Sequence, residues 1–172
     1  MVEHGRTDPT EGSRWRRLRL LQEAMDADIA RIYDEADIDG LKPSFVMELI
    51  RLHVRGPMTI KALAESVQRT HSAMSQKVAA MRTAGWVRTT AGADARSKQV
   101  SLTTKAECVI GQLVAEWKAT EAAVADIEAE IPYPLSQVVT DIENALEHKS
   151  FHDRIAEKLA EDTGWRRSGP RT

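Results

Sequence analysis

The stretch from Thr59 to Gly85 constrains the fold more than any other part of the chain, because it holds two short helical patterns in close succession. Each pattern repeats its apolar residues at helical spacing, and a four-residue link joins the two. Thr59 stands where a helix N-cap is expected, and Gly85 stands at a C′ position. The spacing predicts helices over about 60–67 and 70–84, with inward residues Ile60, Leu63, Ala64, Val67, Met74, Val78 and Met81.

Two strand-like runs follow, over 86–90 and 99–102, and their alternating side chains predict a β-hairpin. We call this hairpin, residues 86–102, the wing. Its tip carries Asp94 and Arg96 among small residues and has nothing apolar to bury. The tip is therefore either an ordinary solvated turn or a finger that touches a partner.

The part of the chain before Thr59 predicts two helices. One is expected after Ser13, a candidate N-cap, and continues to about residue 36. An acidic, glycine-containing loop follows, and Pro43 then opens a short helix, since its ring suits the first helical position.

The part after the wing predicts three more helices. Thr104 and Glu107 have capping-box spacing and mark the start of a long helix that reaches about residue 128. An apolar stripe predicts a second helix over about 135–146. Ser150 and Asp153 form another capping box, which predicts a last helix.

Charge is distributed unevenly along the chain. The segment 59–105 holds eight basic and two acidic residues, which is a net +6, whereas the rest of the chain carries −8. A basic segment in an acidic chain indicates a surface for polyanions. Chance clustering of surface cations is the alternative.

Two short helices, a tight link and a hairpin are the parts of a winged helix-turn-helix, so the expected fold class is mainly α with a small β-hairpin wing. In that arrangement the second helix enters the major groove, and the hairpin reaches over the backbone or into a minor groove. Lys61, Lys77 and Arg82 flank the second helix at positions suited to phosphates. The side of this helix opposite its apolar residues carries short polar or small side chains that suit base edges, with a solvated face as the alternative: Ser72, Ser75, Gln76 and Ala79.

From Leu63 to Ala106 the chain closely resembles the multiple-antibiotic-resistance regulator (MarR) family of winged-helix transcription factors. The order of the other helices also fits, so the resemblance covers nearly the whole chain between its tails. It implies a homodimer in which the terminal helices of both subunits interlock. The resemblance rests on Leu63-Ala64-Glu65, Ser75 in a helix that ends at Gly85, Val87-Arg88, Asp94-x-Arg96 and Leu102-Thr103.

The resemblance also implies roles in the wing, where Arg96 would enter the minor groove and Asp94 would steady nearby basic side chains. Three positions depart from the family pattern. Gln68 takes the place of the usual turn glycine, and a positive φ there would cost about 1 kcal/mol. Arg69 replaces an apolar residue, and Ala106 replaces a common glycine.

The expected organisation is a single domain over 14–162, with polar tails at 1–13 and 163–172 that lack fixed structure. Within the domain, the winged-helix core is expected over about 43–104. Dimerisation helices are expected before it, over about 14–36, and after it, over about 104–161. A winged helix alone cannot bury the apolar stripes of these outer helices, and an exposed stripe of that size normally marks an interface. Packing within one chain is the alternative.

Several other side chains are candidates for chemistry. His148 and His152 are one helical turn apart beside Asp153, but a third ligand is not evident, so no metal site is expected. Cys108 is the single cysteine, which excludes an intramolecular disulfide, and a buried thiol is expected there rather than a redox sensor. A small-molecule effector site between the helices and the DNA-binding lobe is conceivable, with structural core as the alternative role for each lining residue: Tyr33, His53, Trp86, Cys108 and Trp117.

The sequence therefore predicts a dimeric, sequence-specific DNA-binding transcriptional regulator, in the form of a repressor released by a small-molecule effector. It predicts neither an enzyme nor a cofactor, since no nucleophile–base pair, paired carboxylates or phosphate loop is present. No run is apolar enough to span a bilayer and no signal peptide is evident, so a cytoplasmic protein is expected. The alternative is a winged-helix protein-interaction module without DNA binding. The predicted contacts to double-stranded DNA are Lys61, Arg69, Thr70, His71, Ser72, Ser75, Gln76, Lys77, Arg88, Asp94, Arg96, Ser97 and Lys98.

Overall fold

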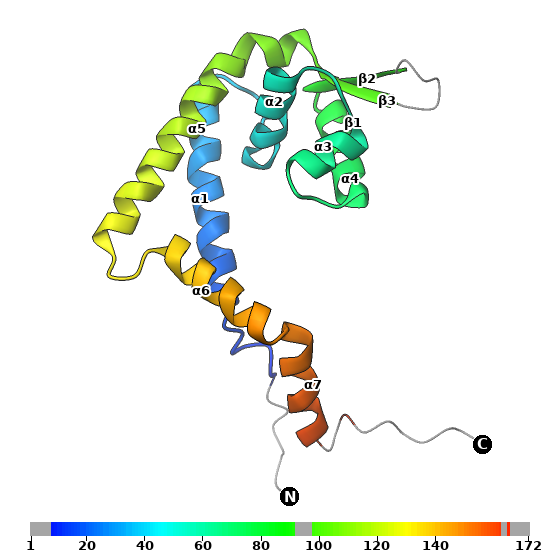
Figure 1. Ribbon diagram of the computed structural model, residues 1–172. Helices are drawn as coiled ribbons and strands as arrows, with labels where there is room; N and C mark the ends of the chain where they lie inside the picture. The colour runs from blue at the N-terminus through cyan, green and yellow to red at the C-terminus, as the bar shows by residue number, and fades with distance from the viewer. Residues whose placement is uncertain (1–7, 92–97, 163–164, 166–172) are drawn as a thin grey trace, which may run out of the picture. The chain divides into compact units, whose positions relative to one another are not determined.

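The computed structural model is mainly helical with one small sheet, and it describes residues 8–91, 98–162 and 165 (Figure 1). Within these residues, no helix is both long and apolar enough to cross a membrane. The elements run in the order α1 (Arg16–Glu35), α2 (Pro43–Arg55), β1 (Met58–Thr59), α3 (Ile60–Ser66), α4 (His71–Thr83), β2 (Val87–Ala91), β3 (Lys98–Leu102), α5 (Thr104–Glu130), α6 (Leu135–His148) and α7 (Phe151–Glu161).

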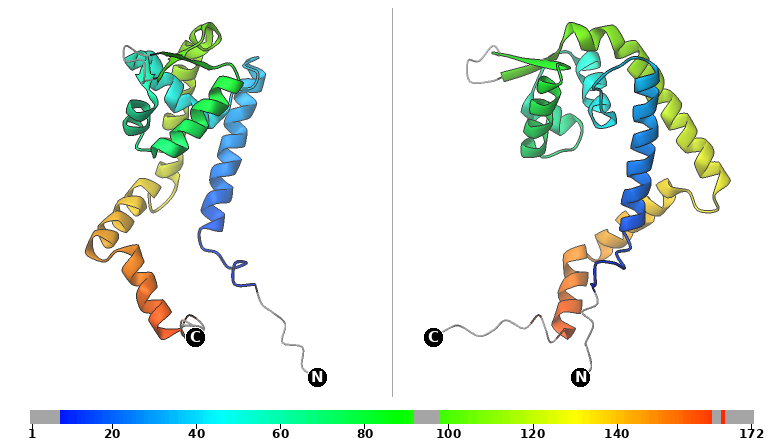
Figure 2. Two further views of the ribbon diagram at one scale, coloured as in Figure 1. Left: turned by 90° about the vertical axis from the view of Figure 1, so that its right-hand side faces the viewer. Right: turned by 180° about the vertical axis from the view of Figure 1, so that it is seen from behind.

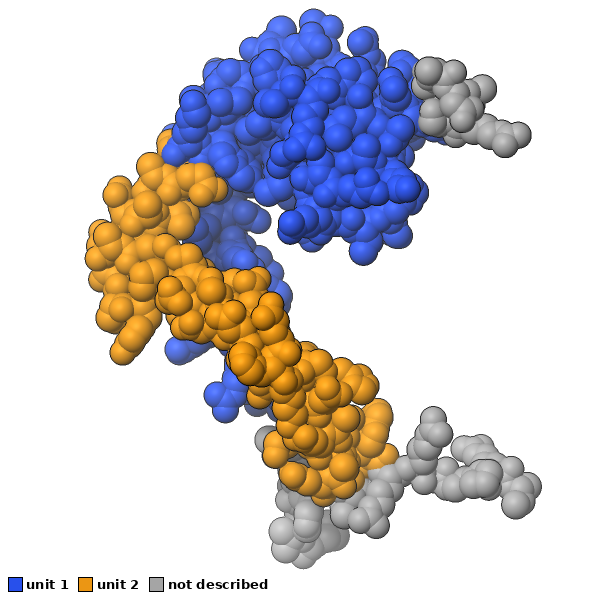
Figure 3. Space-filling model, viewed as in Figure 1, with its two compact units in different colours: residues 1–118 blue, residues 119–172 orange. Residues whose placement is uncertain are grey.

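The chain divides into two compact units at a point inside α5. The first unit is Met1–Lys118 and the second is Ala119–Thr172 (Figure 3). The first unit holds α1 to β3 and the beginning of α5, and it contains the predicted winged-helix core. The single domain expected over 14–162 stays a prediction.

The wing is confirmed as an antiparallel hairpin in which Val87 pairs with Leu102 and Thr89 with Val100. It projects from the side of the body formed by α2, α3 and α4 (Figures 1 and 2). The sequence did not reveal β1, which pairs with β3 and completes a three-stranded sheet in the order β1-β3-β2. Two residues are too few to show the alternation that identifies a strand.

The starts of α2 and α3 follow the sequence prediction, whereas the sequence did not reveal Thr70 as the cap of α4. Pro43 is the first residue of α2. The Thr59 hydroxyl accepts a hydrogen bond from the Ala62 amide at 3.1 Å, and the Thr70 hydroxyl accepts one from the Ala73 amide at 3.2 Å. These contacts fix where α3 and α4 begin.

Two predicted caps are wrong. The helix α1 begins at Arg16 with Trp15 in the N-cap position, and Ser13 lies in the turn before it. The cap of α5 is Thr103 rather than Thr104, because the Thr103 hydroxyl accepts a hydrogen bond from the Ala106 amide at 3.3 Å. The same hydroxyl donates to the Gly85 carbonyl at 2.7 Å, so the start of α5 is tied to the end of α4.

The core of the first unit lies between α2, α3, α4, the sheet and the first half of α5. Its members on α3 and α4 come from the predicted apolar positions, and each helix contributes residues from one side only. The fully buried side chains include Leu49, Leu63, Met74, Met81, Trp86, Val87, Val100 and Leu113.

The turn between α3 and α4 keeps the geometry that glycine favours, although Gln68 occupies it. Gln68 has φ of 53°, in the left-handed region. Its amide donates to the Glu65 carbonyl at 3.2 Å, and the Arg69 amide donates to the Ala64 carbonyl at 2.9 Å. These two bonds are the pair found in a Schellman motif. The turn therefore does not change to suit the larger residue, and the Cβ of Gln68 carries the strain.

Replacing Gln68 with glycine is expected to stabilise the protein by about 0.5–1 kcal/mol, because glycine adopts this backbone without a Cβ clash. The midpoint of thermal unfolding should rise by about 2–4 °C for a chain of this size. Gln68→Ala is the matched control, since it keeps the Cβ and should leave the midpoint almost unchanged. A glycine variant that is less stable than the wild type would contradict the proposal that Gln68 holds a strained backbone.

The second unit consists of the end of α5 with α6 and α7. Ser150 is confirmed as the N-cap of α7, since the Asp153 amide donates to the Ser150 hydroxyl at 3.1 Å. Arg154 closes the end of α6 by donating to the carbonyls of Ala145, at 2.8 Å, and Lys149, at 3.1 Å. The turn between the two helices is thus held by polar contacts, while the apolar stripes of both helices stay exposed.

Candidate nucleic-acid interface

The helix α4 separates its apolar and polar residues as predicted. Met74, Val78 and Met81 are buried in the core of the first unit. The other side of the helix presents short polar or small side chains to solvent, namely Ser72, Ser75, Gln76 and Ala79. Side chains of this size leave room for the helix backbone to come close to a partner. His71 and Thr70 at the beginning of α4 are also exposed. Base contacts by these residues stay predictions.

Lys77 does not lie where the sequence predicted it. Its amine is 2.8 Å from the Glu48 carboxylate on α2 and donates to the Ser44 carbonyl at 2.8 Å. Only 24% of the Lys77 side chain is exposed. The predicted phosphate contact is therefore not supported by this geometry, because the amine already has two partners inside the protein.

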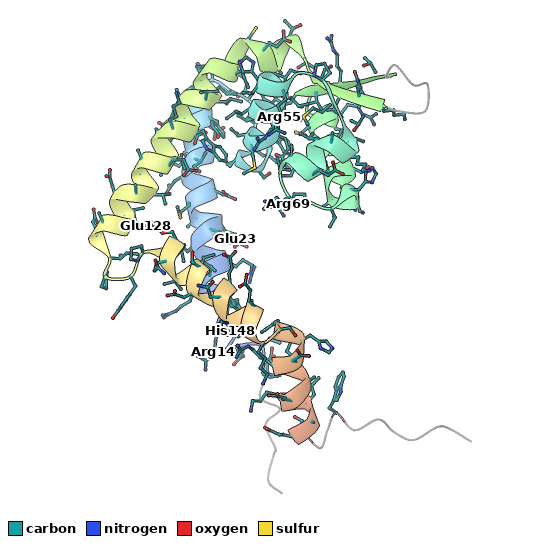
Figure 4. All side chains as sticks on the ribbon, viewed as in Figure 1. Arg14, Glu23, Arg55, Arg69, Glu128 and His148 are labelled. Atoms are coloured by element: carbon teal, nitrogen blue, oxygen red, sulfur yellow. The ribbon has the colours of Figure 1, made fainter. Side chains whose placement is uncertain are left out.

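The other predicted cations on α3, the link and α4 are exposed. Lys61 lies 3.9 Å from Glu65 one helical turn away, which is a weak surface pair. Arg69 lies in the link between α3 and α4, where Figure 4 labels it. Arg82 lies in the last turn of α4 and is exposed. These three guanidinium and ammonium groups are available to phosphates.

The two strands of the wing carry one further cation each. Arg88 on β2 is exposed, and its Nε donates to the hydroxyl of the cross-strand residue Ser101 at 3.2 Å. Lys98 on β3 is exposed. The wing tip, with Asp94, Arg96 and Ser97, lies outside the described residues, so their proposed roles stay predictions.

Trp86 anchors the wing to the body, a role that the sequence did not reveal. Its indole is fully buried, and its Nε1 donates to the Gly40 carbonyl at 3.1 Å. The Lys105 amine lies 3.9 Å from the ring centroid and donates to the Asp39 carbonyl at 3.1 Å. The start of the wing is thereby held against the α1–α2 loop and α5.

None of the hollows found among the described residues is lined by more than one of the five residues proposed for an effector site. Tyr33 is buried, and its hydroxyl donates to Glu116 at 2.7 Å; burial and this carboxylate raise the pKa of the phenol. Trp86 belongs to the core, so the structural alternative holds for Tyr33 and Trp86. Cys108 is exposed on α5, and the expectation of a buried thiol is wrong for this chain.

His53 and Trp117 line two different hollows. His53 borders an open hollow of about 470 Å³ that Arg88 and Glu107 also line. Trp117 borders a smaller hollow of about 260 Å³ whose other walls are mainly apolar side chains of α2: Met47, Ile50, Arg51 and Val54.

The two histidines of the second unit make separate contacts. His148 Nδ1 lies 2.7 Å from the Asn144 carbonyl, and His152 Nδ1 lies 3.2 Å from the Asp153 carboxylate. Among the described side chains, no group of three or more His, Cys, Asp or Glu is placed to hold a metal ion.

Comparison with known proteins agrees with this architecture. Residues 44–106 match the family model of a winged helix DNA-binding domain. No curated protein gives a match.

Solved structures similar to this chain include transcriptional regulators and a MarR protein. The Mycobacterium tuberculosis transcriptional regulator MosR, solved in complex with DNA, is 21% identical with a TM-score of 0.57, over 79% of this chain and 97% of that one. The Staphylococcus aureus MepR–DNA complex is 14% identical with a TM-score of 0.58, over the same shares of the two chains. A MarR protein from Peptoclostridium difficile is 16% identical with a TM-score of 0.55, over 86% of this chain and 90% of that one. At these identities the likeness confirms the fold that the sequence resemblance implied.

Proposed function

We propose that this chain, a winged-helix protein with the fold of the MarR-type regulators, binds specific sequences of duplex DNA as a homodimer and regulates transcription. The observation that carries the proposal is the exposed face of α4, where the side chains of Ser72, Ser75 and Gln76 are open to solvent. Such side chains suit hydrogen bonds to base edges in the major groove. The two relatives solved with DNA support the same use of the fold.

The proposed contacts divide by their chemistry. Cations outside the base-reading face would neutralise phosphates, which positions the protein without reading sequence. The wing would add Arg96 in a minor groove, with Asp94 as its orienter. Lys77 is left out of the phosphate set because Glu48 holds its amine. The phosphate set is then Lys61, Arg69, Arg82, Arg88 and Lys98.

The homodimer would form through the outer helices. Leu20, Leu21 and Ile32 on α1 are exposed, as are the apolar residues along α6 and α7: Leu135, Val138, Val139, Ile142, Leu146, Phe151 and Ile155. Exposed apolar stripes of this kind normally mark an interface, and a two-fold dimer covers them on both copies at once. A dimer would also give two α4 helices, one for each half of a symmetric DNA site.

Sedimentation at micromolar concentration is expected to give twice the chain mass of 19.2 kDa. Selection of bound fragments from random duplexes is expected to enrich two half-sites about 10 bp apart, because two-fold related recognition helices read one face of the duplex. A monomer mass would end the dimer proposal. A clear dimer that enriches no sequence would favour a protein-interaction module instead.

Release by a small molecule is the finer part of the proposal. The hollow bordered by Trp117 supports it, since its walls are apolar and one guanidinium, that of Arg51, lies among them. Such a lining suits a small hydrophobic anion. Adding compounds of this class to the selected DNA complex tests the idea, and failure of all of them to weaken binding would speak against an effector at this place.

A further inference from the structure

The partly buried ion pair between α2 and α4 is the feature of the first unit that packing alone does not explain. Glu48 is 1% exposed, and its Oε1 lies 2.8 Å from the Lys77 amine. Its second carboxylate oxygen, Oε2, is buried and has no hydrogen-bond partner among the described residues. The Lys77 amine also donates to the Ser44 carbonyl, one helical turn before Glu48.

Both charged residues occupy positions where the helical pattern calls for an apolar side chain. On α2 the buried side is Phe45, Leu49 and Leu52, and Glu48 falls between them at the i+3 position. Lys77 has the same place on α4, since it follows Met74 by three residues and precedes Val78. The two charges therefore face each other across the helix interface in place of one more apolar contact.

An ion pair of this kind is a weak source of stability. Desolvating two charges offsets much of their attraction, and well-packed apolar residues in the same place are often as stable or more so. The orphaned Oε2 adds a further cost. Directionality is what the pair supplies, because apolar contacts tolerate rotation and sliding of one helix on another, whereas an amine held by two fixed oxygens does not.

We propose that the Glu48–Lys77 pair is a positioning element that fixes the rotation and the axial setting of α4, and through it the DNA sequence that the protein prefers. Lys77 directly follows Gln76 and lies two residues after Ser75. A rotation or a shift of α4 that displaces Lys77 therefore displaces both of these side chains as well. Hydrogen bonds to base edges need donor–acceptor geometry within narrow limits. Contacts to phosphates by exposed cations are much less sensitive to such a shift. The inference rests on the proposed DNA binding.

The test compares the wild type with the double variant Glu48→Met/Lys77→Met, which replaces the pair by apolar side chains of similar length. The ratio of affinities for the selected duplex and for a random duplex of equal length is measured at several salt concentrations. The double variant is expected to remain a folded dimer with an unfolding midpoint equal to or above that of wild type. Its affinity ratio is expected to fall by about tenfold or more, the scale of a displaced base contact, with the salt slope unchanged.

Two further variants separate this role from others. Lys61→Met removes an exposed cation of the phosphate set and is expected to reduce the salt slope by about one per protomer with the affinity ratio unchanged. Glu48→Gln keeps an oxygen acceptor for the Lys77 amine, so its affinity ratio is expected to stay within about threefold of wild type even if its midpoint falls. If the double variant does not fold, Glu48→Gln is compared with Glu48→Met, which removes the acceptor for the Lys77 amine: the affinity ratio is expected to fall in the Met variant and not in the Gln variant, and equal ratios would overturn the inference.

The outcomes divide cleanly. A double variant that behaves like Lys61→Met would make Lys77 a phosphate contact and overturn the inference. The double variant could also change only the unfolding midpoint and leave both the affinity ratio and the salt slope unchanged. The pair would then be purely structural, and the inference would be overturned. If wild type binds no duplex, the proposed function fails, and the inference with it. Selective binding by wild type that the double variant retains in full would overturn the inference alone.

Discussion

Raising the salt concentration from about 50 mM to about 200 mM is expected to weaken binding of the dimer to its selected duplex by about 10³- to 10⁵-fold. The reason is the release of counterions when exposed cations such as Lys61, Arg69 and Lys98 meet phosphates. With about three to five contacts per protomer and a slope of about −0.9 per contact, log K should fall against log[salt] with a slope of about −5 to −9. Fluorescence anisotropy of a labelled duplex over a salt series measures this slope.

The prediction has a matched control within the chain. Lys98→Gln removes one exposed cation from each protomer and should reduce the slope by about two for the dimer. Lys149→Gln removes a cation that pairs with Glu157 in the second unit, outside the phosphate set, and should leave the slope unchanged. A wild-type slope near zero would contradict the proposed phosphate contacts and favour a protein-interaction module.

Local patterns explain why the winged-helix core could be predicted from the sequence. The start of α4 is marked by Thr70, its buried side by Met74 and Val78, and its end by Gly85, all within one short segment. Hairpin strands are likewise defined by alternation between neighbours in sequence. Each of these signals acts over a few residues, so no knowledge of tertiary structure was needed.

The position of Lys77 could not be predicted in the same way, because its partner lies 29 residues away on another helix. A lysine at the edge of a buried stripe can point its flexible stem either toward solvent or toward an acid in the core. The placement of Glu48 within the apolar stripe of α2 was the available signal. An acid at such a position needs a cation, and α4 offers Lys77 at the matching place.

Cys108 shows a related limit. The buried residues of α5 in the first unit are Ala106, Ile110 and Leu113, and Cys108 lies about 200° around the helix from Ala106. Long helices with apolar residues on several sides do not reveal which side faces their own core. The proposed effector residues lie in different places for the same reason. Tyr33 and Trp117 are aromatic residues on helices, and the packing of those helices decides which residues surround them.

The sheet strand β1 and the cap at Thr103 were missed for a third reason. Both depend on contacts that form only when the wing closes on the body: Met58 pairs with Val100, and Thr103 bonds to the Gly85 and Trp86 carbonyls. Such contacts leave no periodic trace in the chain. The same region gives the largest expected effect of a substitution on stability.

Trp86→Ala is expected to lower the free energy of unfolding by about 3–5 kcal/mol, the range for truncating a large aromatic residue in a core. The indole is fully buried, and its loss would leave a cavity where α4 ends and β2 begins. It would also remove the donor to the Gly40 carbonyl and the ring beneath the Lys105 amine. Urea denaturation followed by circular dichroism measures the change.

Two smaller substitutions show which part of the contact matters. Trp86→Phe keeps an aromatic ring in the core but loses the indole N–H, so it should cost clearly less than Trp86→Ala. Lys105→Met removes the exposed amine over the ring, a contact of about 0.5–1 kcal/mol, together with its hydrogen bond to the Asp39 carbonyl. Since small domains are stable by about 5–15 kcal/mol in total, the alanine variant should be close to unfolding at 37 °C while the methionine variant is not. If Trp86→Ala cost no more than Lys105→Met, the wing would not be anchored through the buried indole, and the tie between Thr103 and Gly85 would have to hold it instead.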